Sequence, residues 1–250
     1  MKWLCCPGAY GSIENFKVQL APFVKEFEGD NVEFHFTQGE NTCEPPPGFD
    51  EYFGPGPHYR FMNYDGLRDN DVLERIRDFP EGEVPEDVLR ELFPSEDKAT
   101  FVQKSVSDAL AALYRTVEKY GPFDGIIGYS EGTVIAGTLI LDEKRRLEEE
   151  GRERQFKQAI FFNGWPPMQP KDGTVVLSDQ SEQVIDIPTL HCVGADDPYL
   201  HGAMALYNVC DEDTAILFDH GKGHTIPRDT QTLKELGDSI RNMETADFDI

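Results

Sequence analysis

The chain has 250 residues, which is long enough to bury the core of one α/β domain, and we expect a single domain over residues 1–250. Its 23 Lys and Arg residues are outnumbered by 47 Asp and Glu residues, so the formal net charge is −24 at pH 7. A surface dominated by negative charge repels nucleic acid and anionic membranes, and neither is expected as a partner.

The beginning of the chain is apolar only over the length of a strand before Pro7, which is too short for a signal peptide or a membrane span. The five cysteines show no C-x-x-C spacing, so reduced structural thiols are expected. The adjacent Cys5 and Cys6 would point to opposite faces of a strand. These features predict a soluble, cytoplasmic protein.

Strand and helix patterns alternate from the beginning of the chain. Residues 2–6 are predicted as a strand, residues 12–27 as a helix capped by Ser12, and residues 32–37 as a second strand. The alternation then breaks.

Residues 39–65 combine Pro45-Pro46-Pro47 and Gly54-Pro55-Gly56-Pro57 with six Phe and Tyr residues. This composition argues against regular structure, and the aromatic side chains argue against simple disorder. We therefore expect an irregular, aromatic-rich lid. It would lie in an insertion over about residues 39–94 that also contains short helices near 72–79 and 85–93.

The segment Gly128-Tyr129-Ser130-Glu131-Gly132 lies between an apolar strand at 123–127 and an apolar helix at 131–150, after a long helix at 95–120. A sharp turn from strand to helix exposes the serine at its apex, and glycines on either side let the two elements pass closely. The five-residue pattern is modest support by itself, but this context predicts that Ser130 is the nucleophile of a hydrolase.

The second half of the chain returns to alternation, with strands predicted at 159–162, 189–194 and 215–219 and helices near 199–209 and 233–241. Residues 164–187 are expected to be irregular. Alternating strands and helices predict an α/β fold with a mainly parallel sheet and helices on both faces. In such a sheet, functional side chains come from loops at the carboxyl ends of the strands.

Two further loops at that edge carry suitable side chains: Asp196-Asp197 follow one strand, and the segment from His220 to His224 follows the next. Serine, aspartate and histidine in this chain order are typical of the α/β-hydrolase triad. His224 would take the proton of the serine and later return it, and Asp197 would orient the imidazole.

A triad hydrolase also needs donors for the oxyanion that develops on the substrate. The backbone N–H of Glu131, at the positive end of a helix dipole, is one candidate. The backbone N–H of Ala9, in the loop after the first strand, is the other.

Each assignment has an alternative. Asp196 and Asp197 could instead cap the helix that follows Pro198. His220 and His224 are spaced like a zinc pair, but the intervening glycines disfavour a helix and no third ligand follows, so neither a metal nor another cofactor is expected. His220 directly follows its strand, and we expect it to pack or hydrogen-bond.

Taken in order, these features resemble the fungal serine hydrolase family of α/β-hydrolases over about residues 2–240. The resemblance rests on Leu4-Cys5-Cys6-Pro7-Gly8 with Phe16, Gly128-Tyr129-Ser130-Glu131-Gly132, Phe162-Asn163-Gly164 with Pro166-Pro167, residues 188–197, and His220-Gly221-Lys222-Gly223-His224 with Pro227. It implies an esterase or thioesterase that releases or trims a polyketide-type acyl chain in fungal secondary metabolism. The chain departs from the family at Pro7, where histidine is usual, and so loses a side-chain donor and a backbone N–H.

The leading hypothesis is a serine esterase or thioesterase that acts through an acyl-enzyme on a small-molecule acyl ester or thioester, free or bound to a carrier protein. Tyr10, Tyr129 and Trp165 are the candidate pocket residues, and the aromatic lid favours an apolar acyl group. The alternative is a binding or cyclisation protein of a biosynthetic pathway that keeps the fold without hydrolysis, which Pro7 favours.

Overall fold

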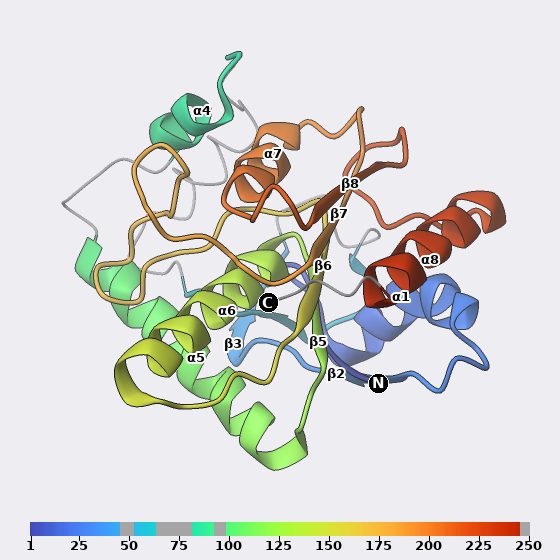
Figure 1. Ribbon diagram of the computed structural model, residues 1–250, viewed down its shortest axis with the longest axis horizontal. Helices are drawn as coiled ribbons and strands as arrows, with labels where there is room; N and C mark the ends of the chain where they lie inside the picture. The colour runs from blue at the N-terminus through green and yellow to red at the C-terminus, as the bar shows by residue number, and fades with distance from the viewer. Residues whose placement is uncertain (46–52, 64–81, 93–98, 246–250) are drawn as a thin grey trace.

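A six-stranded parallel sheet runs through the centre of the molecule (Figure 1). The computed structural model describes residues 1–45, 53–63, 82–92 and 99–245. The strand order is β2-β1-β5-β6-β7-β8, and every neighbouring pair is parallel. The strands are β1 (Lys2–Cys6), β2 (Glu33–Phe36), β5 (Gly125–Tyr129), β6 (Gln158–Phe162), β7 (Thr189–Val193) and β8 (Ala215–Asp219). The predicted parallel α/β sheet is confirmed.

Helices cover both faces of this sheet. In Figure 1 the sheet is seen nearly edge-on, with α1 (Ile13–Glu26) and α8 (Thr230–Thr245) to its right and α5 (Ala99–Tyr120) and α6 (Glu131–Glu150) to its left. The shorter α7 (Leu200–Asn208) packs with the core on the α6 side. The sheet is therefore the middle of three layers.

Neighbouring residues of a strand supply the two cores in turn, because strand side chains alternate between faces. Trp3 and Cys5 pack with the residues of α1 and α8, whereas Leu4 and Cys6 pack with those of α5 and α6. The opposite placement of Cys5 and Cys6 is thus confirmed. Burial raises the pKa of both thiols, which keeps them protonated and unreactive.

The segment after β2 departs from the prediction. Residues expected to be irregular include two short antiparallel strands, β3 (Asn41–Cys43) and β4 (His58–Arg60). The prolines and glycines lie between these strands rather than in them, so they do not prevent the pairing. Glycine is required at position 39, where the chain passes close to β4, because a Cβ there would stand 2.0 Å from the backbone oxygen of Arg60.

The other predicted elements differ mainly at their ends. A helix near 85–93 is confirmed as α4 (Pro85–Leu92), and the last helix is longer than predicted. The helix expected near 72–79 and much of the expected lid lie outside the described residues. None of the helices in the described ranges combines the length and the apolar character needed to cross a membrane.

Candidate active site

The turn that carries Ser130 is the most constrained backbone of the site. Strand β5 ends at Tyr129 and α6 begins at Glu131, so the serine alone makes the turn, with φ 51° and ψ −121°. A positive φ is unfavourable for serine, and the surrounding contacts must hold it. Gly132 lets the start of α6 pack closely against the end of β1, because a Cβ at this position would stand 2.2 Å from the backbone oxygen of Cys6.

The three residues expected to form a triad lie in contact. Ser130 Oγ is 3.0 Å from His224 Nε2, and His224 Nδ1 is 2.8 Å from Asp197 Oδ2. The side chain of Asp197 is 2% exposed and that of His224 is 20% exposed, so the carboxylate is sealed and the imidazole reaches the surface. Loops after β5, β7 and β8 thus meet at the carboxyl edge of the sheet, where the chain order alone suggested they would.

The carboxylate of Asp197 is held by three donors. The backbone N–H of Tyr199 donates to Oδ1 at 2.8 Å, and Asn163 Nδ2 donates to Oδ2 at 2.9 Å, the oxygen that also faces His224. Asp197 also binds the backbone of the residue before α7, but the N-cap of that helix is Tyr199, without a side-chain capping hydrogen bond, so neither Asp196 nor Asp197 is its N-cap. The neighbouring Asp196 is exposed.

His224 is held through its backbone and its ring. The hydroxyl of Tyr129 donates to the carbonyl oxygen of His224 at 3.1 Å, and the rings of Tyr129 and Tyr199 lie 5.5 and 5.1 Å from the imidazole. The loop itself packs against Gly194, where a Cβ would stand 1.8 Å from the carbonyl oxygen of Lys222. These contacts fix where the imidazole can point.

The loop after β1 lies directly beside the nucleophile. A Cβ on Gly8 would stand 3.1 Å from the Cβ of Ser130, and the N–H of Gly11 donates to the carbonyl oxygen of Gly8 at 3.1 Å, closing a turn. Ala9 belongs to this turn, and Tyr10 in it has φ 64°. The two segments expected to supply the oxyanion donors are thus adjacent.

The three candidate pocket residues are all buried. Tyr10 packs against Phe53 at a ring distance of 4.9 Å, and Trp165 packs against Tyr199 at 5.8 Å. Tyr129 contacts His224 and uses its hydroxyl on that loop.

His220 is buried and packs near the triad without belonging to it. Its Nε2 lies 3.4 Å from Asn163 Oδ1, and burial lowers the pKa of its imidazole, which favours the neutral ring. Among the described residues, no group of three or more His, Cys, Asp or Glu side chains is placed to hold a metal ion.

Two side chains contribute to the site in ways that the sequence did not indicate. Asn163 contacts the carboxylate of Asp197; the sequence placed it in a motif directly after a buried strand but indicated no role for its side chain. The carboxylate of Glu131 accepts hydrogen bonds from the backbone N–H groups of Phe61 and Met62, at 3.0 and 3.3 Å. Nothing in the sequence pairs residues 61 and 62 with residue 131.

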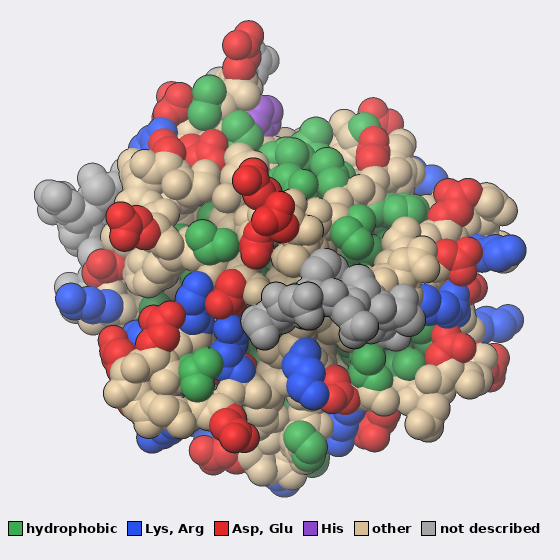
Figure 2. Space-filling model, in the orientation of Figure 1, with side chains coloured by type: hydrophobic (Ala, Val, Ile, Leu, Met, Phe, Trp, Pro, Cys, Tyr) green, Lys and Arg blue, Asp and Glu red, His purple; other side chains and the backbone are tan. Residues whose placement is uncertain are grey.

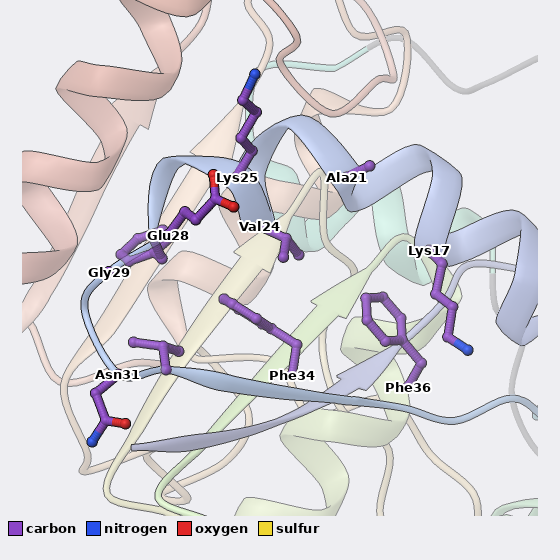
Figure 3. Close-up of a pocket in the computed structure, with 11 residues that line it drawn as sticks. Lys17, Ala21, Val24, Lys25, Glu28, Gly29, Asn31, Phe34 and Phe36 are labelled. Carbon is purple, nitrogen blue, oxygen red and sulfur yellow. The ribbon is translucent and has the colours of Figure 1, made fainter.

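A groove of about 860 Å³ lies away from this site, between α1 and the edge strand β2 (Figure 3). Its lining includes Val24, Phe34 and Phe36, with Lys17 and Lys25 at its margins. None of the three loops around Ser130 contributes to it. On the face shown in Figure 2, acidic side chains are spread over the surface rather than gathered at one place.

A parallel sheet with a serine at a strand-to-helix turn, and an aspartate and a histidine at the same edge, defines an α/β-hydrolase. Solved structures agree on the fold. Arabidopsis thaliana SOBER1 matches with a TM-score of 0.52 at 15% identity, over 98% of this chain and 99% of that protein. The Bacillus cereus carboxylesterase matches with a TM-score of 0.51 at 15% identity, over 96% and 87%.

Within this class, the chain belongs to the serine hydrolase (FSH1) family, which matches residues 1–236. Curated relatives are fungal. Hydrolase phiM of Talaromyces stipitatus is 26% identical over 94% of this chain and 84% of its own length. Esterase FUS5 of Gibberella moniliformis is 28% identical over 95% and 84%, and Esterase FPY3 of Fusarium mangiferae is 32% identical over 57% and 66%.

Proposed function

We propose that the protein hydrolyses an ester or thioester through an acyl-enzyme, with Ser130 as nucleophile, His224 as base and acid, and Asp197 as the residue that orients the imidazole. The observation that carries the proposal is the continuous contact from Ser130 Oγ to His224 at 3.0 Å and from His224 to Asp197 at 2.8 Å. A serine hydroxyl is a poor nucleophile by itself, and this arrangement supplies the base that it needs.

The reaction follows from the positions of these atoms. As Ser130 Oγ attacks the acyl carbon, its proton passes to His224 Nε2, and the charged imidazole is stabilised by Asp197 at Nδ1. The tetrahedral intermediate collapses when His224 gives the proton to the leaving alkoxide or thiolate. A water molecule then attacks the acyl-enzyme by the same route, releasing the acid and restoring the serine.

The oxyanion would be bound by the backbone N–H groups of Glu131 and Ala9. Two facts support this part of the proposal: Glu131 is the first residue of α6, and the loop that contains Ala9 lies against Ser130 through Gly8. Pro7 removes a donor from the beginning of that loop but leaves the N–H of Ala9 in place.

For the substrate, we propose a polyketide-type acyl chain, with Tyr10, Tyr129 and Trp165 around the acyl group. The aromatic character of these residues and the esterase names of fungal relatives support an apolar acyl ester or thioester. Hydrolysis of matched oxygen esters and thioesters of one acyl chain would distinguish the two leaving groups.

Charge favours a small substrate over a docked carrier protein. Acyl carrier proteins are acidic as a class, and this chain has a net charge of −24. Basic residues gather at the end of α6 and just after it: Lys144, Arg145, Arg146, Arg152 and Arg154. Several of them form ion pairs, such as Arg145 with Asp142 and Arg154 with Asp186. Comparing a carrier-bound acyl chain with its small thioester mimic tests this: a much higher kcat/KM for the carrier-bound form would contradict it.

A fluorophosphonate probe tests the proposed chemistry most directly. Ser130 should displace fluoride and become phosphonylated, and mass spectrometry of the labelled peptide should place the adduct on residue 130. Ser130→Ala is the matched control and should not label. Absence of labelling in the native protein would instead favour the non-hydrolytic alternative.

A further inference from the structure

The side chain of Asn163 is buried at the centre of the triad's supporting contacts. It lies directly after β6, and the residue is 1% exposed. Its Nδ2 donates to Asp197 Oδ2 at 2.9 Å and to the carbonyl oxygen of Gly223 at 3.1 Å. One amide group therefore contacts both the loop that carries the triad acid and the residue before the triad base.

The surroundings fix which way the amide faces. Its two N–H donors face a carboxylate and a carbonyl, and both of these groups can only accept. On the other side, Oδ1 lies 3.4 Å from His220 Nε2, which can donate when the ring is neutral. A flipped amide would place its oxygen against two acceptors, so only one orientation satisfies all three neighbours.

The backbone of Asn163 is also fixed. Its N–H continues the sheet ladder by donating to the carbonyl oxygen of Cys192 at 2.9 Å, and its φ is 45°. Asparagine and glycine adopt this left-handed conformation more readily than most residues. The side chain therefore extends from a rigid strand end.

We propose that Asn163 is a positioning residue, which holds the Asp197 carboxylate and the His224 loop in the arrangement that lets His224 reach Ser130. This inference rests on the proposed function. Asn163 touches none of the reacting atoms and acts through Asp197 Oδ2 and the carbonyl oxygen of Gly223. His220 supports it by fixing the amide oxygen.

Two substitutions separate this role from simple support of the fold. N163G removes the amide and keeps a residue that tolerates the positive φ. N163D keeps the shape and the backbone preference, but an ionised carboxylate would face the Asp197 carboxylate where the donor stood, and like charges at that distance repel. When protonated, the introduced carboxyl can again donate to Asp197 Oδ2.

This protonation gives a pH signature. The introduced carboxyl would be faced by Asp197 from the loop after β7 and by His220 and His224 from the loop after β8, with Tyr129 and Tyr199 beyond the imidazole. Burial and the neighbouring carboxylate both raise the pKa of the introduced carboxyl. N163D should thus approach native behaviour as the pH falls, whereas N163G should not.

The experiment measures the second-order rate constant for fluorophosphonate labelling of full-length native protein, N163G and N163D, from about pH 8 to about pH 5.5, a range chosen for a buried carboxyl paired with another. N163G should react about 10- to 100-fold more slowly than the native protein at every pH, the scale expected for small displacements of reacting groups. The ratio of N163D to native should rise as the pH is lowered.

Asn31→Asp is the matched control, because Asn31 also has a positive φ, 55°, but is exposed and lies far from Ser130 in the loop before β2. It should label at the native rate. A native rate for folded N163G, or a pH-independent ratio for folded N163D, would overturn the positioning role. If N163D does not fold, the labelling rate of N163G alone tests the positioning role. An unreactive native protein would instead refute the proposed function.

Discussion

The turn that carries Ser130 and the segment that packs beside it are held by different kinds of contact. Around the turn, backbone lies against backbone: a Cβ on Gly132 would stand 2.2 Å from the carbonyl oxygen of Cys6 and 2.5 Å from that of Pro7. Residues 53–63 include β4, which pairs with β3 through the backbone, but side-chain hydrogen bonds attach this segment to α1 and α6. Asn15 donates to the carbonyl oxygen of Phe53, and Glu131 accepts from Phe61 and Met62.

The two kinds of contact differ in how steeply their energy rises when the atoms are displaced. Overlap between backbone atoms rises sharply with displacement and cannot be relieved by a change of rotamer. A side-chain hydrogen bond contributes about 0.5–1.5 kcal/mol net, or about 1.5–3 kcal/mol where one partner is charged, and its strength changes more gradually with displacement. The site therefore combines a turn that close backbone contacts constrain with a neighbouring segment that side-chain hydrogen bonds attach to α1 and α6, and each can be disturbed separately.

The largest expected effect is on kcat, and it comes from a substitution in the turn that should leave folding unchanged. Ser130→Ala should lower kcat by about a millionfold, as loss of the nucleophile does in other triads, with an unchanged melting temperature. Turnover of a chromogenic ester, with calorimetry on the same samples, checks both. Near-native turnover by this variant would contradict the assignment of Ser130.

Gly132→Ala should destabilise the fold at the turn rather than remove a catalytic group. The added methyl group would overlap the carbonyl oxygens of Cys6 and Pro7, so we expect a loss of about 3 kcal/mol or more in the free energy of unfolding. The matched control is Gly137→Ala on the same helix, where a Cβ would meet only side-chain atoms, Cβ of Pro167 at 3.3 Å and Cδ1 of Ile185 at 3.5 Å. Chemical denaturation should show a small change there, and equal losses in the two variants would remove the contrast.

Glu131→Ala should weaken the attachment of residues 61–62 to α6 and leave the turn intact. The N–H groups of Phe61 and Met62 would lose a buried acceptor, at about 1–3 kcal/mol for each group left without a partner. Hydrogen exchange at these two amides should accelerate, while the amides of β5 keep their protection. Glu131→Gln retains an acceptor oxygen and should restore part of the protection, and no difference between the two variants would argue against the carboxylate as the anchor.

The smallest expected change in stability concerns α4, which lies in the same insertion, about residues 39–94, as the segment 53–63. Burial alone would raise the pKa of Glu86, but hydrogen bonds from Asn208 and Ser178 outweigh it and hold the pKa below its usual range. Because the pKa of Glu86 is lower in the folded state than in the unfolded chain, the ionised carboxylate stabilises α4 at pH values above its unfolded pKa. This contribution is lost as the pH falls through the pKa of Glu86 in the folded state.

The protection factors of the α4 amides, which correct for the intrinsic dependence of exchange on pH, should therefore fall toward acid pH in the native protein. Glu86→Gln should have lower protection factors at neutral pH and a weaker dependence of these factors on pH, with a change of about 1 kcal/mol or less. A variant that keeps the native pH dependence would show that another group is responsible.

Much of the fold could be predicted because it depends on local pattern. The apolar strands β1, β5, β6 and β7 are buried on both faces, and such strands are continuous apolar runs in a sequence. The short strands β3 and β4 were missed because they lie among residues typical of turns, and their pairing joins positions 41–43 to positions 58–60. Pairing across a loop leaves no periodic signal in either partner.

The sequence by itself determined the strand-to-helix turn at Ser130 and the order in which an aspartate and a histidine follow it, because local backbone preferences and the direction of parallel strands fix both. Only the tertiary structure decided which groups hold these residues. Asn163 reaches Asp197 across 34 positions, and Glu131 reaches Phe61 across 70. Such contacts depend on how loops pack at the edge of the sheet, and the sequence, although it places both residues in motifs, does not show which groups their side chains meet there.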